Sequence, residues 1–178
     1  MSCLISQGRK LPCKSAFGGI KTVFLTDFGG VTGVTQDTQT REYAITGSPS
    51  WFQYDVKGNS SLETTVTSSR ENGTTFYTQT LNLTLTYLDP KTQFQLERIA
   101  RGRPQIAVED YYGNTFLCGF ENGMEVTGGT VVTGAAAGDL SGFTLTFEGM
   151  EEFAPLFLSE AVVGSGDQID PTAIEILP

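Results

Sequence analysis

The sequence predicts a mainly β protein with one flanking α-helix, extended terminal arms and a long polar loop. Three observations lead to this fold class. Threonine and glycine are abundant, several short runs alternate apolar with polar residues, and Asn-Gly pairs at Asn72 and Asn122 separate such runs as hairpin turns do. A length of 178 residues suits one domain. We therefore expect a single domain over 1–178, with arms at 1–17 and 164–178 and a loop at 57–73.

The clearest strand is expected over 75–88. Leu81, Leu83 and Leu85 alternate there with polar residues, and this period of two leaves one face wet. Other short runs, bounded by turn residues, have the same character. They predict strands over 20–28, 42–46, 51–56, 62–67, 106–109, 115–120, 123–127, 130–133 and 143–148.

One helix is expected directly after the longest strand. Asp89 is suited to cap it and Pro90 to occupy its first turn, while Glu97 and Arg101 are spaced to form an ion pair on its surface. A second, short helix is expected over 150–158, although a proline lies late in that segment.

Three polar segments have weak patterns. The glycine-rich stretch 29–40 and the C-terminal segment 164–178 are expected to be mobile in an isolated molecule. The segment 57–73 is mostly serine, threonine, asparagine, glycine and charge, so its strand at 62–67 is the weakest of those predicted. A domain with such segments often uses them on a partner; plain disorder is the alternative.

The composition excludes several kinds of chemistry. The chain has no histidine, so it contains no Ser-His-Asp or Cys-His catalytic set and no histidine-ligated zinc. Neighbouring carboxylates occur at 109–110 and 151–152, but adjacent residues of a strand point to opposite faces and do not converge. We therefore expect no catalytic, cofactor-binding or metal-binding residues and no enzyme. A hydrolase that uses carboxylates alone is the competing hypothesis.

Charge and cysteine usage give further expectations. The formal net charge is -9, which argues against a protein that grips nucleic acid electrostatically. Every basic residue lies at or before Arg103, and eight of the 11 fall in groups at 9–21 and 91–103, which favours a basic face and an acidic face that attract copies of the chain. Unselected surface charge is the alternative. No export signal is apparent, so Cys3, Cys13 and Cys118 are expected to be reduced.

The aromatic group Trp51, Phe52 and Tyr54 has two interpretations. Its members are core residues of a short strand, or they form an exposed platform for a ligand such as a sugar. The core interpretation is favoured.

The order of segments from residue 51 to 158 resembles that of phage tail tube proteins. The resemblance rests on the strand at 77–88 and the helix after it, and on four later segments. These read RPQIAVED at 103–110, GNTFLCG at 113–119, ENGM at 121–124 and GFTLTFEGME at 142–151.

The resemblance implies a β-sandwich or small barrel with one flanking helix, and a structural role in the virion tail. Subunits of that family form hexameric rings that stack into a hollow, acidic-walled tube, through which DNA leaves the capsid without specific binding. Implied partners are other copies of the chain, the tape measure protein and the terminator protein, assembled in the host bacterial cytoplasm, with no cofactor and no membrane. An early loop and the terminal arms bridge subunits in that family, which makes Asn59, Glu63 and Arg70 of the loop 57–73 candidate inter-subunit contacts. Arg98 and Arg101, from the basic group at 91–103, are further candidates because an acidic face of another copy would attract them. A non-enzymatic fibre or receptor-binding β-sandwich is the alternative function.

Overall fold

The computed structural model describes residues 7–11, 13–14, 17–56, 59–166 and 169. Strands dominate it, and one helix lies between the sixth and seventh strands. In chain order the elements are β1 (Ile20–Thr26), β2 (Val31–Gln36), β3 (Tyr43–Gly47), β4 (Phe52–Asp55), β5 (Ser61–Ser69), β6 (Thr74–Thr86), α1 (Pro90–Ile99), β7 (Gln105–Asp110), β8 (Thr115–Cys118), β9 (Glu125–Val132), β10 (Gly142–Glu151) and β11 (Leu156–Leu158).

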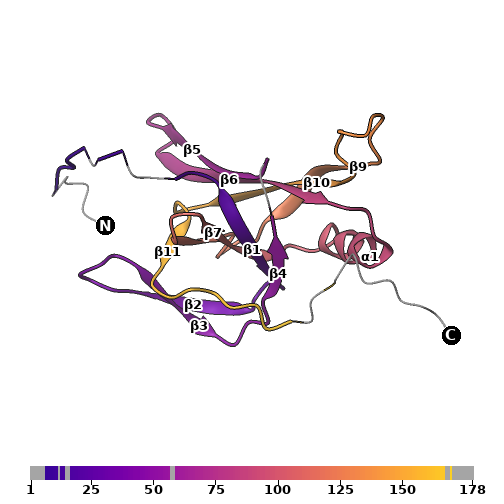
Figure 1. Cartoon of the computed structure of the whole chain (residues 1–178). Helices are drawn as coiled ribbons and strands as arrows, with labels where there is room; N and C mark the ends of the chain where they lie inside the picture. Colours follow the sequence, from indigo (N-terminus) through magenta and orange to yellow (C-terminus); the bar gives the residue numbers. More distant parts are fainter. Residues whose placement is uncertain (1–6, 12, 15–16, 57–58, 167–168, 170–178) are drawn as a thin grey trace.

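The strands form two sheets that pack face to face. One has seven strands in the order β2-β3-β11-β8-β7-β1-β4, and the other has four in the order β5-β6-β10-β9. Figure 1 shows the four-stranded sheet as the upper layer, β1 and β7 below it, and the β2–β3 hairpin as the lowest layer. The expected mainly β fold with one helix is confirmed, and of the two expected architectures it is the sandwich. The described strands close no barrel.

The main core lies between the two sheets. Inward-facing residues of β6 and β10, such as Leu81, Leu83 and Phe147, meet Val23 of β1 and Ile106 of β7 there. These five side chains are at most 2% exposed. Because only the inward face of β6 is buried, its sequence alternates apolar with polar residues, and this pattern predicts the strand. The helix covers one end of this core with its buried Leu96.

A second core lies on the opposite face of the seven-stranded sheet. Phe24, Trp51, Ala107 and Leu117 form its centre, with Leu156 of β11 packed against them. The sheet curls so that the β2–β3 hairpin closes this core from below (Figure 1). Because β1 and β7 are covered on both faces, they contain nearly continuous apolar runs.

The helix begins as expected. The Asp89 carboxylate accepts hydrogen bonds from the backbone N–H groups of Lys91 at 2.9 Å and Thr92 at 3.0 Å, and Pro90 occupies the first turn. The expected ion pair between Glu97 and Arg101 is absent from the described ion pairs. Glu97 instead accepts a 3.4 Å hydrogen bond from Gln93. No helix in the described ranges is long and apolar enough to cross a membrane.

Three sequence predictions are wrong in part. The segment 57–73 is not one long loop, because the strand expected at 62–67 is confirmed as β5, which pairs with β6 along its whole length although its own sequence is polar. The segment 29–40 contains strand β2, whose first residue is fixed by two hydrogen bonds to the buried Gln105 side chain. The segment 150–158 contains no helix, because β10 continues to Glu151 and β11 follows.

The strands expected at 123–127 and 130–133 are one strand. β9 pairs with β10 from Val132 back to Glu125, and its register shifts by one residue at Thr127. The two glycines after Thr127, Gly128 and Gly129, had suggested a break in the sequence.

The expected arms are described only in part. Residues 1–6, 12 and 15–16 of the N-terminal arm, and 167–168 and 170–178 of the C-terminal arm, lie outside the described residues, as do 57–58 of the expected loop. Residues 7–11 are exposed and have no regular structure. Ser165 and Gly166, at the start of the C-terminal arm, each donate a backbone hydrogen bond to the carbonyl of Trp51.

Candidate functional site

The four-stranded sheet has two open edges. β5 forms one edge and β9 the other, with 9 and 8 residues respectively. Most residues of both strands are exposed, in contrast to the central strands β6 and β10. An exposed strand edge presents unpaired backbone N–H and C=O groups and is a template for pairing with another strand. These edges are therefore candidate interaction surfaces.

The outward face of the same sheet is polar and acidic. Its side chains alternate with buried residues such as Leu81, Leu83 and Phe147. Threonine dominates it, and every charged side chain on the outward positions of the four strands is a glutamate. The outward residues include Ser61, Glu63, Thr65, Thr67, Thr78, Thr80, Asn82, Thr84, Thr86, Glu125, Thr130, Thr144, Thr146, Glu148 and Met150.

The three glutamates lie in one row across the sheet. Glu63 of β5 pairs with Thr80 of β6, Thr80 with Glu148 of β10, and Glu148 with Glu125 of β9. Directly opposite residues of antiparallel strands lie close together, so Glu148 and Glu125 repel each other. The row of glutamates does not stabilise the folded chain. The negative charge that it places on the outward face is therefore a candidate functional feature.

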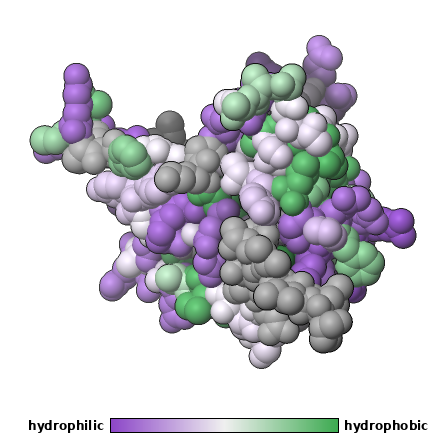
Figure 2. Space-filling model, turned by 45° about the vertical axis from the view of Figure 1, so that its right-hand side comes forward, coloured by the Kyte–Doolittle hydropathy of each residue, from purple (hydrophilic) through white to green (hydrophobic). Residues whose placement is uncertain are grey.

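The inner face of each edge is apolar. Leu62 and Val66 of β5 point to the core side of the sheet, as do Val126 and Val131 of β9. Leu62 and Val126 reach the main core, whereas Val66 is 56% exposed and Val131 62% exposed. Figure 2 shows apolar surface gathered at the end of the molecule that carries β9. Both edges thus carry apolar surface that the isolated molecule leaves in water.

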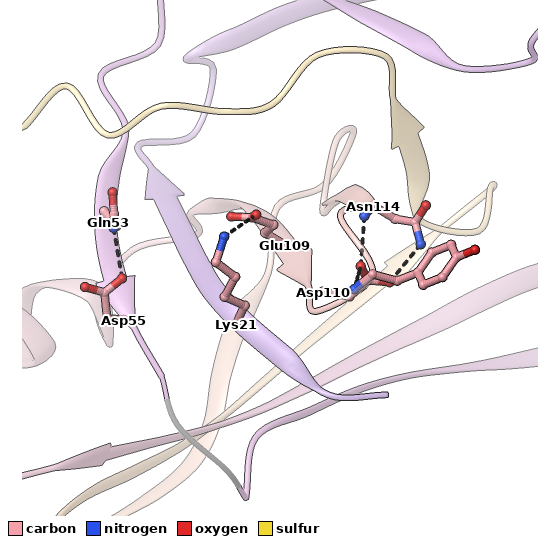
Figure 3. A network of polar contacts seen from close by, with 7 residues as sticks. Lys21, Gln53, Asp55, Glu109, Asp110 and Asn114 are labelled. Carbon is pink, nitrogen blue, oxygen red and sulfur yellow. Dashed lines mark hydrogen bonds and ion pairs between the residues drawn. The ribbon is translucent and has the colours of Figure 1, made fainter. Parts of the chain in front are cut away.

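The neighbouring carboxylates Glu109 and Asp110 have separate structural roles. Glu109 forms a 2.7 Å ion pair with Lys21 across β7 and β1 (Figure 3). Asp110 accepts hydrogen bonds from the backbone N–H groups of Tyr112 and Asn114 and from the Asn114 side chain. These contacts hold the β7–β8 turn, and the two carboxylates do not converge on a common point.

The second carboxylate pair is also divided. Glu151 is 5% exposed and accepts the backbone N–H groups of Glu121 at 3.1 Å and Asn122 at 2.9 Å, whereas Glu152 is exposed. Burial raises the pKa of Glu151, although the two N–H donors oppose the shift. The pocket beside it, lined by Gln79, Leu117, Phe120, Glu151, Phe153, Ala154 and Leu156, has a volume of about 10 Å³, room for one water. Glu151 therefore clamps the β8–β9 turn.

Two other residue types can be placed. Cys118 is a buried free thiol whose pKa is raised by burial, and Cys3 lies outside the described residues. Trp51 is 6% exposed and belongs to the second core, and Tyr54 packs against the main core, as the favoured interpretation predicted. For Phe52, which is 43% exposed, that interpretation is wrong.

The candidate inter-subunit residues do not form one surface. Glu63 lies on the outward face of β5, Asn59 just before that strand, and Arg70 at the tip of the β5–β6 hairpin. Arg98 and Arg101 lie at the C-terminal end of α1, at the opposite side of the molecule from that hairpin (Figure 1). Glu125 and Glu148, which complete the glutamate row, were missed, because only strand register brings them together.

The expected single basic face is not formed by the described residues. Residues 7–11, which include the basic residues Arg9 and Lys10, lie at one end of the molecule and α1 at the other (Figure 1). Lys21, from the first basic group, forms an ion pair with Glu109. The charge asymmetry of the sequence appears instead as a cation-free outward face on the four-stranded sheet.

Comparisons with protein-family models, with curated proteins and with solved structures find no match to this chain. The open edges and the outward face of the four-stranded sheet are therefore the features from which a function is inferred.

Proposed function

We propose that this protein is a structural subunit that assembles into stacked rings and forms the hollow tail tube of a phage, through which DNA passes. The observation that carries the proposal is the four-stranded sheet, because both of its edges are open and its outward face is polar, acidic and free of cations. The resemblance of residues 51–158 to tail tube proteins supports the same role.

Strand direction supports closure into a ring. Neighbours in the order β5-β6-β10-β9 are all antiparallel, so β9 runs opposite to β5. Rotation of a copy about a ring axis preserves strand direction, so β9 of one copy meets β5 of the next in antiparallel orientation. Repetition of this contact removes every open edge of the four-stranded sheet, as closure does in any barrel.

The outward face supports the role of a channel wall. The inner face of the four-stranded sheet is covered by the seven-stranded sheet and α1. In a ring closed through the β5 and β9 edges, the uncovered face with its threonines and glutamates therefore turns to the lumen. Glutamates repel DNA phosphates, and threonine hydroxyls offer no charge to bind them. Six copies, as the resemblance implies, give roughly 24 strands, more than the 16–18 that already enclose an aqueous channel.

The proposal includes the setting that the resemblance implies. The subunit is assembled in the host bacterial cytoplasm and remains in the virion tail. Its partners are its own copies, the tape measure protein within the growing tube and the terminator protein at its end. No cofactor and no catalytic step enter this role.

The test is assembly of the purified full chain, followed by sedimentation velocity and negative-stain electron microscopy. The wild type is expected to form rings or tubes as its concentration rises. Val66→Lys places a charge on the core side of an edge and is expected to remain monomeric, because inward-pointing lysine blocks edge pairing. Thr38→Lys adds the same charge in the exposed β2–β3 turn and is expected to assemble normally. A wild type that stays monomeric, or a Val66→Lys variant that assembles, contradicts the proposal.

A further inference from the structure

The two open edges of the four-stranded sheet are staggered. Across β6 and β10, Ser61 of β5 is level with Gly128 of β9, and Glu63 is level with Glu125. The rest of β5 extends beyond β9 at one end, and the rest of β9, to Val132, extends beyond β5 at the other. A neighbouring copy placed level would therefore overlap this edge only between these two rungs.

Charge also disfavours level placement. It sets Glu63 of the second copy beside Glu125 of the first, so the glutamate row continues without a break across the junction. Like charges directly opposite each other on a sheet are destabilising. The outward face contributes no cation to compensate them.

If the second copy slides along the edge, the overlap of β9 with β5 becomes longer and Glu63 no longer lies beside Glu125. The slide must be an even number of residues, because an odd one exchanges the core and outward faces. A slide of four residues sets Val132 opposite Ser61 and Glu125 opposite Thr67, so β9 pairs along its whole length. A slide of six sets Val132 opposite Glu63 and Glu125 opposite Ser69.

The apolar residues of the edges distinguish these two registers. The four-residue slide sets Val131 opposite Leu62 and Val126 opposite Val66, so both apolar pairs match on the core side. The six-residue slide sets the same valines opposite Thr64 and Ser68. Val66 and Val131 are the more exposed members of these pairs, and only the four-residue slide covers both with apolar partners.

We propose that β9 pairs with β5 of the next copy in the four-residue register, with Val131 beside Leu62 and Val126 beside Val66. This inference rests on the proposed function and specifies the junction it needs. A slide of four residues over four strands is a rise of about 13 Å over about 19 Å, which tilts the strands by about 35°. Closed barrels have tilts of roughly 35–45°, so the apolar match and barrel geometry agree on this register.

Paired cysteines test the register in the full chain, in a Cys3→Ser and Cys13→Ser background. Thr130→Cys with Glu63→Cys reports the four-residue register, and Thr130→Cys with Thr65→Cys reports the six-residue one. Glu125→Cys with Glu63→Cys reports level pairing. Within one copy, two strands separate the members of each pair, which is too far for a disulfide. Cross-links therefore form only between copies.

After assembly and mild oxidation, the first pair is expected to give a ladder of covalent oligomers on a denaturing gel, at least about tenfold faster than the other two pairs. Circular dichroism and assembly under reducing conditions check that each variant folds. Tubes that cross-link through another pair, or through none, overturn this register and leave the proposed function standing. A reduced chain that never assembles overturns the proposed function and the register with it.

Discussion

Replacement of Val131 by threonine is expected to weaken assembly without affecting the fold. The side chain is 62% exposed in the isolated chain and lies on the core side of the β9 edge. Complete burial of a valine stabilises by about 1.5 kcal/mol at the low end, so covering this exposed part contributes about 1 kcal/mol to the junction. Threonine has nearly the same shape, favours strands and loses this contribution. One kcal/mol corresponds to an about fivefold weaker contact.

The assay is light scattering against protein concentration, from which the critical concentration for assembly is read. Val131→Thr is expected to raise it about fivefold, since each copy contributes one such junction. Val163→Thr is the matched control, because Val163 is 75% exposed and lies outside both edges. The free energy of unfolding of each monomeric variant, measured by thermal unfolding, should differ from that of the wild type by no more than about 0.5 kcal/mol. Equal critical concentrations for Val131→Thr, Val163→Thr and the wild type refute the reasoning.

Three further outcomes follow from the fold. Gln105→Ala leaves the backbone groups of Val31 and the Phe120 carbonyl without their side-chain partner, so urea unfolding should show a loss of about 3 kcal/mol; an unchanged midpoint contradicts this. Asp89→Ala should lower the free energy of unfolding by about 1 kcal/mol at neutral pH. Burial alone would raise the pKa of Asp89, but the hydrogen bonds from Thr92 and from the backbone N–H of Lys91 outweigh it and lower that pKa. The benefit is therefore present above the usual aspartate range and lost as pH falls through the folded pKa, so variant and wild type should converge in acid. Cys118 should react with a thiol reagent only on unfolding, because burial raises its pKa; rapid labelling of the folded protein argues against this core.

The sequence predicts those elements whose own residues carry the pattern. β6 is covered on one face only, so its leucines alternate with polar residues. The helix start is encoded locally by Asp89 and Pro90. β1 and β7 appear as apolar runs because both of their faces are buried.

Elements that depend on distant partners were missed or weakly predicted. β5 is polar, and its conformation comes from its pairing with β6. β2 begins where Gln105, 74 residues away in sequence, binds the backbone of Val31. The segment 150–158 contains helix-favouring residues, but β10 continues to Glu151, whose carboxylate binds the backbone of the β8–β9 turn, and β11 follows at Leu156–Leu158.

The candidate site divides in the same way. Glu63 is a candidate inter-subunit contact on the sequence alone, because it lies in the polar segment 57–73. The row that it forms with Glu148 and Glu125 depends on the registers of three ladders, which the sequence pattern does not specify. The distribution of charge along the chain indicates a basic face, but Lys21 pairs with Glu109, and α1 lies far from the basic residues of segment 7–11.

The central claim is that the outward face of the four-stranded sheet lines a closed channel, and the most direct test is labelling of that face before and after assembly. Thr80→Cys places a thiol in the glutamate row, and Thr38→Cys places one in the exposed β2–β3 turn, both in the Cys3→Ser and Cys13→Ser background. A small maleimide should label both thiols in monomers and in tubes. A maleimide carried on a globular protein should label both in monomers, but only the Thr38→Cys thiol in assembled tubes. Equal labelling of the Thr80→Cys thiol by the protein-linked reagent before and after assembly contradicts the account.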